Sequence, residues 1–226
     1  MAQHSSSADS GLSGFRSRVQ GFYAILDRDD EALARTLVDP AGAGATVLQV
    51  RLKPASAGAV LAAARMARRV TREVGALLVV NDRLDVALEA EADAVHLGQD
   101  DLGLADARAV ARAAGRTLAI GVSTHDLEQV RAALAGGADY LGFGPVFATA
   151  TKHNPDPVVG LGGLAAAALL ARTAGVPLVA IGGIGVGHAR AVFEAGAAAA
   201  CAIGAVNASG DPAAAGRALG APWRRP

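Results

Sequence analysis

Charged side chains follow short apolar runs at three places in the first half of the chain. Arg51 and Lys53 come directly after "VLQV", Asp82 ends "LLVVND", and Asp101 follows "AVHLGQD". Mg2+ in proteins binds one or two carboxylates and completes its shell with water and substrate phosphate oxygens. Two cations and a carboxylate pair therefore predict a polyphosphate held together with Mg2+, provided that the three places meet in the fold.

The second half of the chain carries hydroxyl groups and glycines in comparable positions. The segment "GPVFATATKHNPDP", residues 144–157, contains Thr149, Thr151 and Lys152 and follows the apolar run "YLGFG". The last two apolar runs are followed by "GGIG" and "IGAV". Backbone N–H groups of such loops commonly cradle phosphate, so these segments predict a second anion site with an additional lysine.

Each charged residue also has a structural interpretation. Asp82 and Asp101 could cap the helices that follow them, which for either one alone is the commoner role. Arg51 and Lys53 could be solvated loop charges that pair with Asp82. The functional interpretation depends on all of these groups lying at one edge of the fold.

The histidines give weaker indications. His96 lies inside an apolar run and is expected to be a buried, hydrogen-bonded histidine. His125 and His188 are expected at the starts of helices rather than as catalytic groups.

The elements that must position these residues recur in a regular pattern. Eight short runs are apolar on both alternating faces, as buried parallel strands are. The runs are Phe22–Leu26, Thr46–Val50, Leu77–Asn81, Ala94–Gly98, Leu118–Val122, Tyr140–Gly144, Pro177–Gly183 and Ala200–Ala205. The Ala-rich segments between them are expected to be helices; one has Ser56 as N-cap and Gly75 at its C-terminal end. A compact helix fits between residues 81 and 94, and Ser123 or Thr124 is expected near the start of the helix after the fifth run.

Eight strand–helix units predict an α/β fold, a single (β/α)8 TIM barrel. A doubly wound open sheet is the alternative, but no dinucleotide-binding fingerprint is present. In a barrel, residues that follow the strands meet at the carboxyl-terminal rim, where active sites lie. All the polar groups described above follow strands, so the pattern places them together.

Composition narrows the classes of partner. The chain has 226 residues, of which 52% are apolar, and its formal net charge is zero. We expect one barrel domain over residues 21–220, a disordered tail over 1–20 and a loose end over 221–226. Nucleic acid and membranes are not expected partners, because there is no basic stripe and no long apolar segment. The single cysteine, Cys201, is expected to be a small buried apolar residue, and one cysteine is compatible with a cytoplasmic protein. The sequence leaves homo-oligomer formation open.

Four segments together resemble the thiamine-phosphate synthase (thiamine-phosphate pyrophosphorylase) family. They are "LQVRLK", "NDRLDVALEAEADAVHLGQDDL", "IGVSTHDLEQVRAALAGGADYLGFGPVFATATK" and "VPLVAIGGI", and they cover most of the chain between Phe22 and Val206. The family joins 4-amino-2-methyl-5-hydroxymethylpyrimidine diphosphate to thiazole phosphate, gives thiamine phosphate and pyrophosphate, and requires Mg2+. Its small-molecule substrates would therefore be this chain's partners and Mg2+ its cofactor.

The resemblance also implies roles for individual residues. By its motifs, the metal ligands would be Asp82 and Asp101. The groups around the pyrimidine and its diphosphate would be Gln49, Arg51, Lys53, Asn81 and Lys152. Ser123 would lie near the leaving pyrophosphate, and the thiazole-phosphate site would comprise Thr149, Thr151, Gly183, Ile203 and Gly204. The groups expected to assist catalysis directly are Arg51, Lys53, Ser123 and Lys152, since they stabilise the departing charge. The reaction is expected to be a dissociative substitution, in which no strong protein base is needed.

One residue departs from the family pattern, and two other functions are compatible with the fold. Relatives often have serine where this chain has Gly204, which keeps the backbone N–H and lacks the hydroxyl. The first alternative function is that of a thiazole tautomerase, a related barrel in which the residue matching His125 would transfer a proton. The second is a non-catalytic barrel that binds a phosphate ligand.

Overall fold

The computed structural model describes residues 5–149 and 156–224, with residues 5–11 described by their backbone alone. The strands form a closed parallel barrel in sequence order, in which β1 pairs with β2 and, on its other side, with β8. The strands are β1 (Gly21–Leu26), β2 (Val47–Val50), β3 (Leu77–Asn81), β4 (Ala94–Leu97), β5 (Ala119–Thr124), β6 (Tyr140–Phe143), β7 (Leu178–Ala180) and β8 (Ala199–Ala202). The predicted (β/α)8 barrel is confirmed, and the open sheet is excluded.

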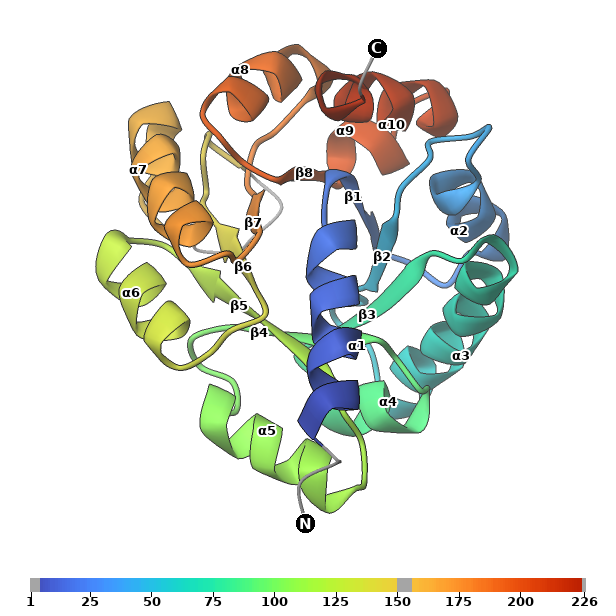
Figure 1. The fold of residues 1–226 in the computed structure, drawn as a ribbon. Helices are drawn as coiled ribbons and strands as arrows, with labels where there is room; N and C mark the ends of the chain where they lie inside the picture. The colour runs from blue at the N-terminus through green and yellow to red at the C-terminus, as the bar shows by residue number, and fades with distance from the viewer. Residues whose placement is uncertain (1–4, 150–155, 225–226) are drawn as a thin grey trace.

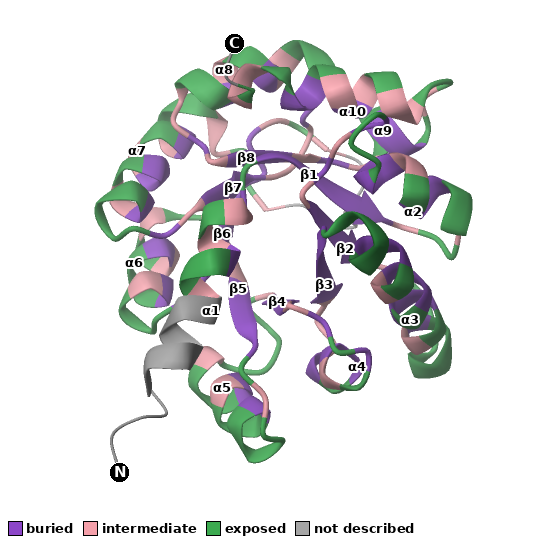
Figure 2. Cartoon of the chain, turned by 45° about the vertical axis from the view of Figure 1, so that its right-hand side comes forward, coloured by how far each residue is buried: buried purple, intermediate pink, exposed green. Residues whose placement is uncertain are grey.

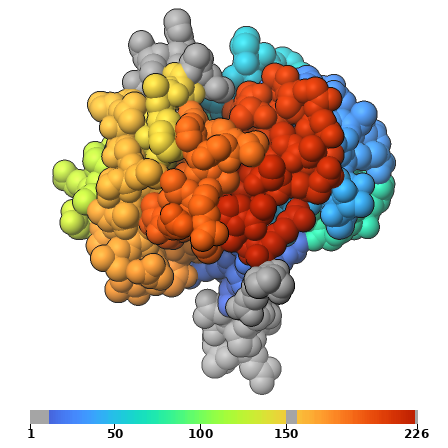
Figure 3. Space-filling view, turned by 90° about the horizontal axis from the view of Figure 1, so that it is seen from above, coloured from blue at the N-terminus to red at the C-terminus, as the bar shows by residue number. Residues whose placement is uncertain are grey.

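The helices surround the barrel as an outer ring, except for the first, which lies across one end of it (Figure 1). They are α1 (Ser5–Arg18), α2 (Glu31–Val38), α3 (Ala57–Val74), α4 (Leu84–Glu89), α5 (Leu104–Ala113), α6 (Leu127–Ala135), α7 (Gly160–Thr173), α8 (Ala189–Glu194), α9 (Gly204–Asn207) and α10 (Pro212–Gly220), with short 3-10 turns η1 (Val186–His188) and η2 (Ala221–Trp223). Figure 2 shows buried residues along the strands and exposed residues on the outward sides of the helices. Figure 3 shows α7, α8 and the C-terminal segment side by side on one outer face.

The helix ends explain why these segments fold locally. The Ser56 side chain accepts a hydrogen bond from the Ala59 N–H and caps α3, and Gly75 ends α3 with a φ of 70°. Both predictions are confirmed, as is the compact α4 helix. The prediction of Ser123 or Thr124 near the start of α6 needs adjustment: both belong to β5, and Asp126 caps α6 through the Gln129 N–H.

Two separate cores follow from the alternation of side chains along each strand. In β1, Phe22, Ala24 and Leu26 pack outward against the helices, whereas Tyr23 and Ile25 point into the barrel. The same alternation applies around the barrel, so every second residue of each strand faces the interior. Residues of that parity at the carboxyl ends of the strands line the mouth of the barrel.

The expectation of a disordered tail over residues 1–20 is wrong for the described part of that segment. Helix α1 lies across the amino-terminal end of the barrel (Figure 1). Phe15 and Val19 are buried in the barrel interior core, and Phe15 packs against the Tyr140 ring with centroids 5.7 Å apart. Leu12 also packs on this core, and Arg16 pairs with the buried Asp139 carboxylate at 3.0 Å, so a few contacts hold a segment whose overall composition is polar.

The expected loose C-terminal end is also ordered as far as residue 224. The Trp223 indole N–H donates to the Ala197 carbonyl at 2.9 Å, and its ring meets Phe193 edge-on at 5.5 Å. Residues 225 and 226 lie outside the described part of the chain.

Candidate active site at the carboxyl end of the barrel

A cavity of about 780 Å3 opens at the carboxyl ends of the strands. Within the described part of the chain, every predicted site residue lines it: Gln49, Arg51, Lys53, Asn81, Asp82, Asp101, Ser123, Thr149, Gly183, Ile203 and Gly204. Thr151 and Lys152 lie outside the described residues, so their predicted roles stay predictions. The fold thus brings together groups that are separated by about 150 positions in the sequence.

Asp82 and Asp101 lie beside each other on one side of this cavity. Their carboxyl groups are within hydrogen-bonding reach, and Lys53 Nζ is 2.5 Å from Asp82 Oδ2. The Lys53 pairing is the one that the simpler interpretation expected, but it lies in the cavity rather than on an outer face. The Asp82 backbone has a φ of 60°, a left-handed conformation uncommon for residues other than glycine. Such conformations concentrate at functional sites, because the surrounding structure must maintain them.

The capping interpretation of the two aspartates is wrong. The N-cap positions of α4 and α5 are Arg83 and Gly103, and neither helix has a side-chain capping bond. Asp101 instead accepts a hydrogen bond from the Gly98 N–H at 2.7 Å. Neither carboxylate caps a helix, and both line the cavity.

The carboxylate pair has the electrostatics of a cation site. Partial burial raises the pKa of the Asp101 carboxyl, and the adjacent Asp82 carboxylate adds to that effect, while the Gly98 N–H and Lys53 oppose it. A cation between the carboxylates would relieve their repulsion. Among the described residues no three His, Cys, Asp or Glu side chains gather into a metal-binding group. A pair of carboxylates that leaves the other ligand positions to water and phosphate fits Mg2+.

Glycines on the opposite side of the cavity allow two loops to pack tightly. The loop after β6 pairs with the loop after β7: the Val146 N–H donates to the Ile181 carbonyl, and the Phe147 N–H donates to the Gly182 carbonyl. Gly183 has a φ of 66°, and a Cβ there would lie 2.4 Å from the Ala148 carbonyl oxygen. This packing positions Thr149 at the edge of the cavity.

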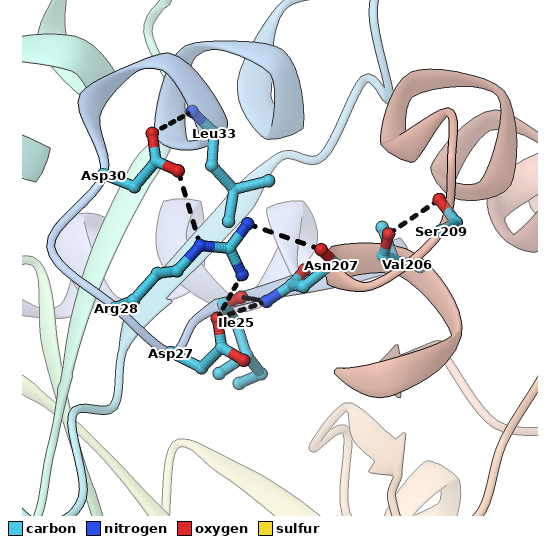
Figure 4. Close-up of polar contacts among 8 residues, drawn as sticks. All are labelled: Ile25, Asp27, Arg28, Asp30, Leu33, Val206, Asn207 and Ser209. Carbon is cyan, nitrogen blue, oxygen red and sulfur yellow. Dashed lines mark hydrogen bonds and ion pairs between the residues drawn. The ribbon is translucent and has the colours of Figure 1, made fainter.

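The loop after β8 is attached to the end of β1. Asn207, in the short helix α9, donates through its side-chain amide to the Ile25 carbonyl and to Asp27 Oδ1 (Figure 4). The Arg28 guanidinium donates to the Asn207 carbonyl in the same cluster. These bonds attach the last residue of α9 to the end of β1, and Gly204 at the first position of α9 lines the cavity. The Val206 and Asn207 N–H groups both donate to the Ile203 carbonyl, so only the amides at the very start of α9 are left for an anion.

A hydrogen-bonded chain crosses the floor of the cavity. It runs from Gln49 through Tyr23, Tyr140 and His96 to Ser123, and each of its four contacts measures 2.9 Å. His96 is buried and bonded through both ring nitrogens, which confirms the expected buried, hydrogen-bonded histidine, and the burial lowers its pKa to about 4. Burial also raises the pKa of both tyrosines. The sequence interpretation missed Tyr23 and Tyr140, although both are hydroxyl-bearing residues at inward-facing positions of predicted strands.

The other two histidines lie at the rim. His125 directly precedes the Asp126 cap of α6, and its Nδ1–H donates to the Gly144 carbonyl at 2.6 Å. His188 starts α8, accepts the Gly185 N–H through Nδ1, and stacks on Phe147 at 4.0 Å. Their expected positions at helix starts are confirmed, and both also line the cavity.

Cys201 faces the interior of the barrel. It is partly accessible within the cavity, and burial raises the pKa of its thiol to about 12. The neutral thiol agrees with the expected apolar role rather than with a nucleophile. No helix in the described part of the chain has the length and apolar character needed to cross a bilayer.

The fold and the cavity define a (β/α)8-barrel enzyme that carries anion-binding groups at the carboxyl ends of its strands. A sequence model described as "Thiamine monophosphate synthase" matches residues 22–206. Thiamine-phosphate synthase of Anaeromyxobacter dehalogenans is 49% identical over 204 residues, covering 89% of this chain and 87% of that protein. The corresponding protein of Chloroflexus aurantiacus is 46% identical over 176 residues, covering 78% of each. Thiamine phosphate pyrophosphorylase of Pyrococcus furiosus, a solved structure, superposes with a TM-score of 0.79 at 36% identity, covering 91% of this chain and 95% of that one.

The chain therefore belongs to the thiamine monophosphate synthase family, and it is a transferase. The resemblance seen in the four sequence segments is confirmed.

Proposed function

We propose that this enzyme joins 4-amino-2-methyl-5-hydroxymethylpyrimidine diphosphate to thiazole phosphate and releases thiamine phosphate and pyrophosphate. The observation that carries the proposal is the presence of two different anion-binding regions in one cavity. The carboxylate pair with Lys53 lies on one side, and the glycine loops lie on the other. A reaction between two phosphorylated substrates requires such a division, and the names of the relatives support this choice of substrates.

The first region suits the diphosphate. Arg51 and Lys53 line the cavity beside Asp82 and Asp101, so cations and metal ligands are close together. When bound there, Mg2+ would neutralise charge on the leaving pyrophosphate. Lys152, outside the described residues, is proposed to add a further positive charge. Gln49 and Asn81 would hold the pyrimidine ring at the mouth of the barrel.

The chemistry requires little proton transfer from the protein. The bond between the pyrimidine methylene carbon and the diphosphate oxygen breaks, and its electron pair leaves with pyrophosphate. The aminopyrimidine ring stabilises the resulting cation, and the thiazole nitrogen attacks the same carbon to form the new carbon–nitrogen bond. Arg51, Lys53 and Ser123 would stabilise the departing negative charge, and the cavity would hold the reactants in line.

The second region suits the thiazole phosphate. Thr149, Gly183, Ile203 and Gly204 lie together along the loops after β6, β7 and β8. The loops offer backbone N–H groups and one hydroxyl, which are donors suited to a phosphate dianion. Thr151 is proposed to contribute a second hydroxyl.

The test is incubation of the purified protein with both substrates and Mg2+, with thiamine phosphate detected by chromatography. We expect product from the wild type and at least about a hundredfold lower turnover for Asp82→Asn, the usual loss when one preorganised charge-stabilising group is removed. Asp85→Asn is the matched control, because Asp85 is exposed and pairs with Arg83 away from the cavity. Absence of product from the wild type at high enzyme concentration would overturn the proposal.

One observation keeps the tautomerase alternative open to test. His125 lines the cavity, and its Nδ1–H bond to the Gly144 carbonyl orients the ring. Conversion of a thiazole carboxylate phosphate tautomer without Mg2+, lost in His125→Ala, would favour that alternative. Formation of thiamine phosphate that survives His125→Ala would exclude a proton-transfer role for His125 in the proposed reaction.

A further inference from the structure

The hydrogen-bonded chain across the cavity floor has a direction that can be worked out from its two ends. At the first end, the Gln49 side-chain N–H donates to the Tyr23 hydroxyl. A tyrosine hydroxyl has one hydrogen, so Tyr23 accepts from Gln49 and can use its own hydrogen for Tyr140. Tyr140 then accepts from Tyr23 and can donate to His96 Nδ1.

The His96 ring continues the same donor-to-acceptor order toward Ser123. His96 is buried with Nδ1 2.9 Å from the Tyr140 hydroxyl and Nε2 2.9 Å from the Ser123 hydroxyl, and a neutral imidazole carries a single N–H. If Nδ1 accepts from Tyr140, the ring hydrogen must be on Nε2, where it can donate to Ser123 Oγ. Ser123 accepts at its oxygen, and its own hydrogen is left for a group in the cavity.

The opposite direction is less favourable at the Ser123 end. Ser123 would then give its hydrogen to His96 Nε2 and present only lone pairs to the cavity. An anion such as pyrophosphate offers only acceptors, so that arrangement would place lone pairs against negative charge. In that direction Tyr140 would donate to Tyr23, and Gln49 would still donate to Tyr23 from its other side. The buried Tyr23 hydroxyl would then have no acceptor for its own hydrogen among the contacts of the described residues. A buried unsatisfied hydroxyl is costly.

Two glycines leave room for the aromatic rings of these hydrogen-bonded residues. Gly121 in β5 pairs with Tyr140 in β6, and a Cβ on Gly121 would lie 2.1 Å from the tyrosine ring. A Cβ on Gly142 would lie 3.2 Å from the His96 ring. Two inward-facing positions therefore lack side chains where the rings of the chain need space.

We propose that Tyr23, Tyr140 and His96 are positioning residues that fix Ser123 as a hydrogen-bond donor toward the departing pyrophosphate. The inference rests on the proposed function for the identity of the anion. The direction of the chain itself is a property of the free protein and can be measured without substrate.

The direct test is nitrogen-15 NMR of the free protein with labelled histidine, which distinguishes the two imidazole tautomers. The His96 signals are assigned by their loss in His96→Gln. We expect His96 to be protonated at Nε2 and unprotonated at Nδ1. Protonation at Nδ1 would overturn the proposal, whatever the activity of the protein.

Variants of the tyrosines in the hydrogen-bonded chain supply a kinetic test. Tyr140→Phe removes the donor to His96, so we expect the tautomer preference to be lost and kcat to fall about tenfold, the value of one hydrogen bond to a charged group. KM for the pyrimidine diphosphate should change less than kcat, because the bond to Ser123 strengthens as pyrophosphate departs. Tyr23→Phe cuts the chain one step earlier and should leave the tautomer unchanged with a smaller loss of kcat. Thr71→Val is the control: it removes a buried hydroxyl that donates to the Arg68 carbonyl in the outer layer, and it should change neither readout.

The outcomes separate this inference from the proposed function. The expected tautomer without thiamine phosphate formation would overturn the function and leave the chain direction standing. Thiamine phosphate formation with an unaltered tautomer and unaltered kcat in Tyr140→Phe would overturn the inference alone.

Discussion

The two ends of the barrel differ in how their carboxylates are paired and exposed. At the amino-terminal end, α1 and the Val19 that follows it cover the opening, with Phe15 and Val19 buried. There the buried Asp139 carboxylate accepts from Arg16, Arg108 and the Ile120 N–H. At the carboxyl-terminal end, Asp82 and Asp101 lie side by side in an open cavity. One end neutralises its carboxylate with the protein's own cations and is closed. The other supplies one lysine, Lys53, for two adjacent carboxylates and leaves them in a cavity open to solvent and ligand.

The difference indicates which end provides stability and which provides function. A buried carboxylate with three donors helps hold the fold, because removing it leaves its partners without a counter-charge. Two neighbouring carboxylates cost the folded state free energy until a cation binds between them. Residues of the first kind should affect unfolding, and those of the second should affect turnover.

The largest effect is expected from breaking the closed end. Asp139→Ala leaves Arg16 and Arg108 without their carboxylate and the Ile120 N–H without an acceptor. We expect unfolding free energy to fall by about 3–5 kcal/mol, measured by urea denaturation, while the folded fraction keeps its KM values. Glu194→Gln, which breaks an exposed pair with Arg190, should change stability by less than about 1 kcal/mol. Equal stabilities for the two variants would contradict the assigned role of Asp139.

The opposite response is expected at the open end. Asp101→Asn retains an acceptor for the Gly98 N–H and removes one of the two like charges. Turnover should fall about a hundredfold or more, while the metal-free protein becomes more stable at pH 7. The pKa of Asp101 is raised by folding, so its ionisation weakens the folded state above its ordinary pKa of about 4. The gain in thermal midpoint should therefore disappear at lower pH, where the carboxyl is neutral in both states. A lower midpoint at pH 7 would contradict this account, with Asp106→Asn on exposed α5 as the control.

A smaller effect would sharpen the assignment of the glycine-lined side. A Cβ at Gly204 would have no atom within 4 Å, and its backbone does not require glycine. Gly204→Ser should supply the hydroxyl that the family resemblance leads us to expect here and lower KM for thiazole phosphate about tenfold, as expected for a hydrogen bond of about 1.5 kcal/mol to a charged group. Gly204→Ala controls for the added carbon. An unchanged or raised KM in Gly204→Ser would move the phosphate away from α9.

The barrel was predictable from the sequence because the pattern of an apolar run followed by a helical segment occurs eight times. Apolar runs and helix caps such as Ser56 and Gly75 are local signals, and the meeting of strand ends follows from the fold class. The grouping of Arg51, Lys53, Asp82 and Asp101 was therefore predictable from the sequence alone.

The parts that were missed depend on contacts between distant residues. Helix α1 has a polar composition, and only the packing of Phe15 on Tyr140 shows why it is ordered. The hydrogen-bonded chain from Gln49 to Ser123 takes its five residues from five different strands, β1, β2, β4, β5 and β6, and local patterns do not specify how the side chains of those strands meet inside the barrel. Alternate residues of each strand face the interior, so both tyrosines could have been selected from the sequence. Tyr23 is two positions before Ile25, and Tyr140 is two and four positions before Gly142 and Gly144, which also face inward.

The central claim is that the open carboxylate pair is a magnesium–pyrophosphate site. Isothermal titration calorimetry of pyrophosphate into the free enzyme, with and without Mg2+, tests it most directly. We predict binding to the wild type that requires Mg2+, weakens strongly in Asp82→Asn and is unchanged in Asp85→Asn. Equal pyrophosphate affinity with and without Mg2+, or full Mg2+-dependent binding by Asp82→Asn, would contradict the account.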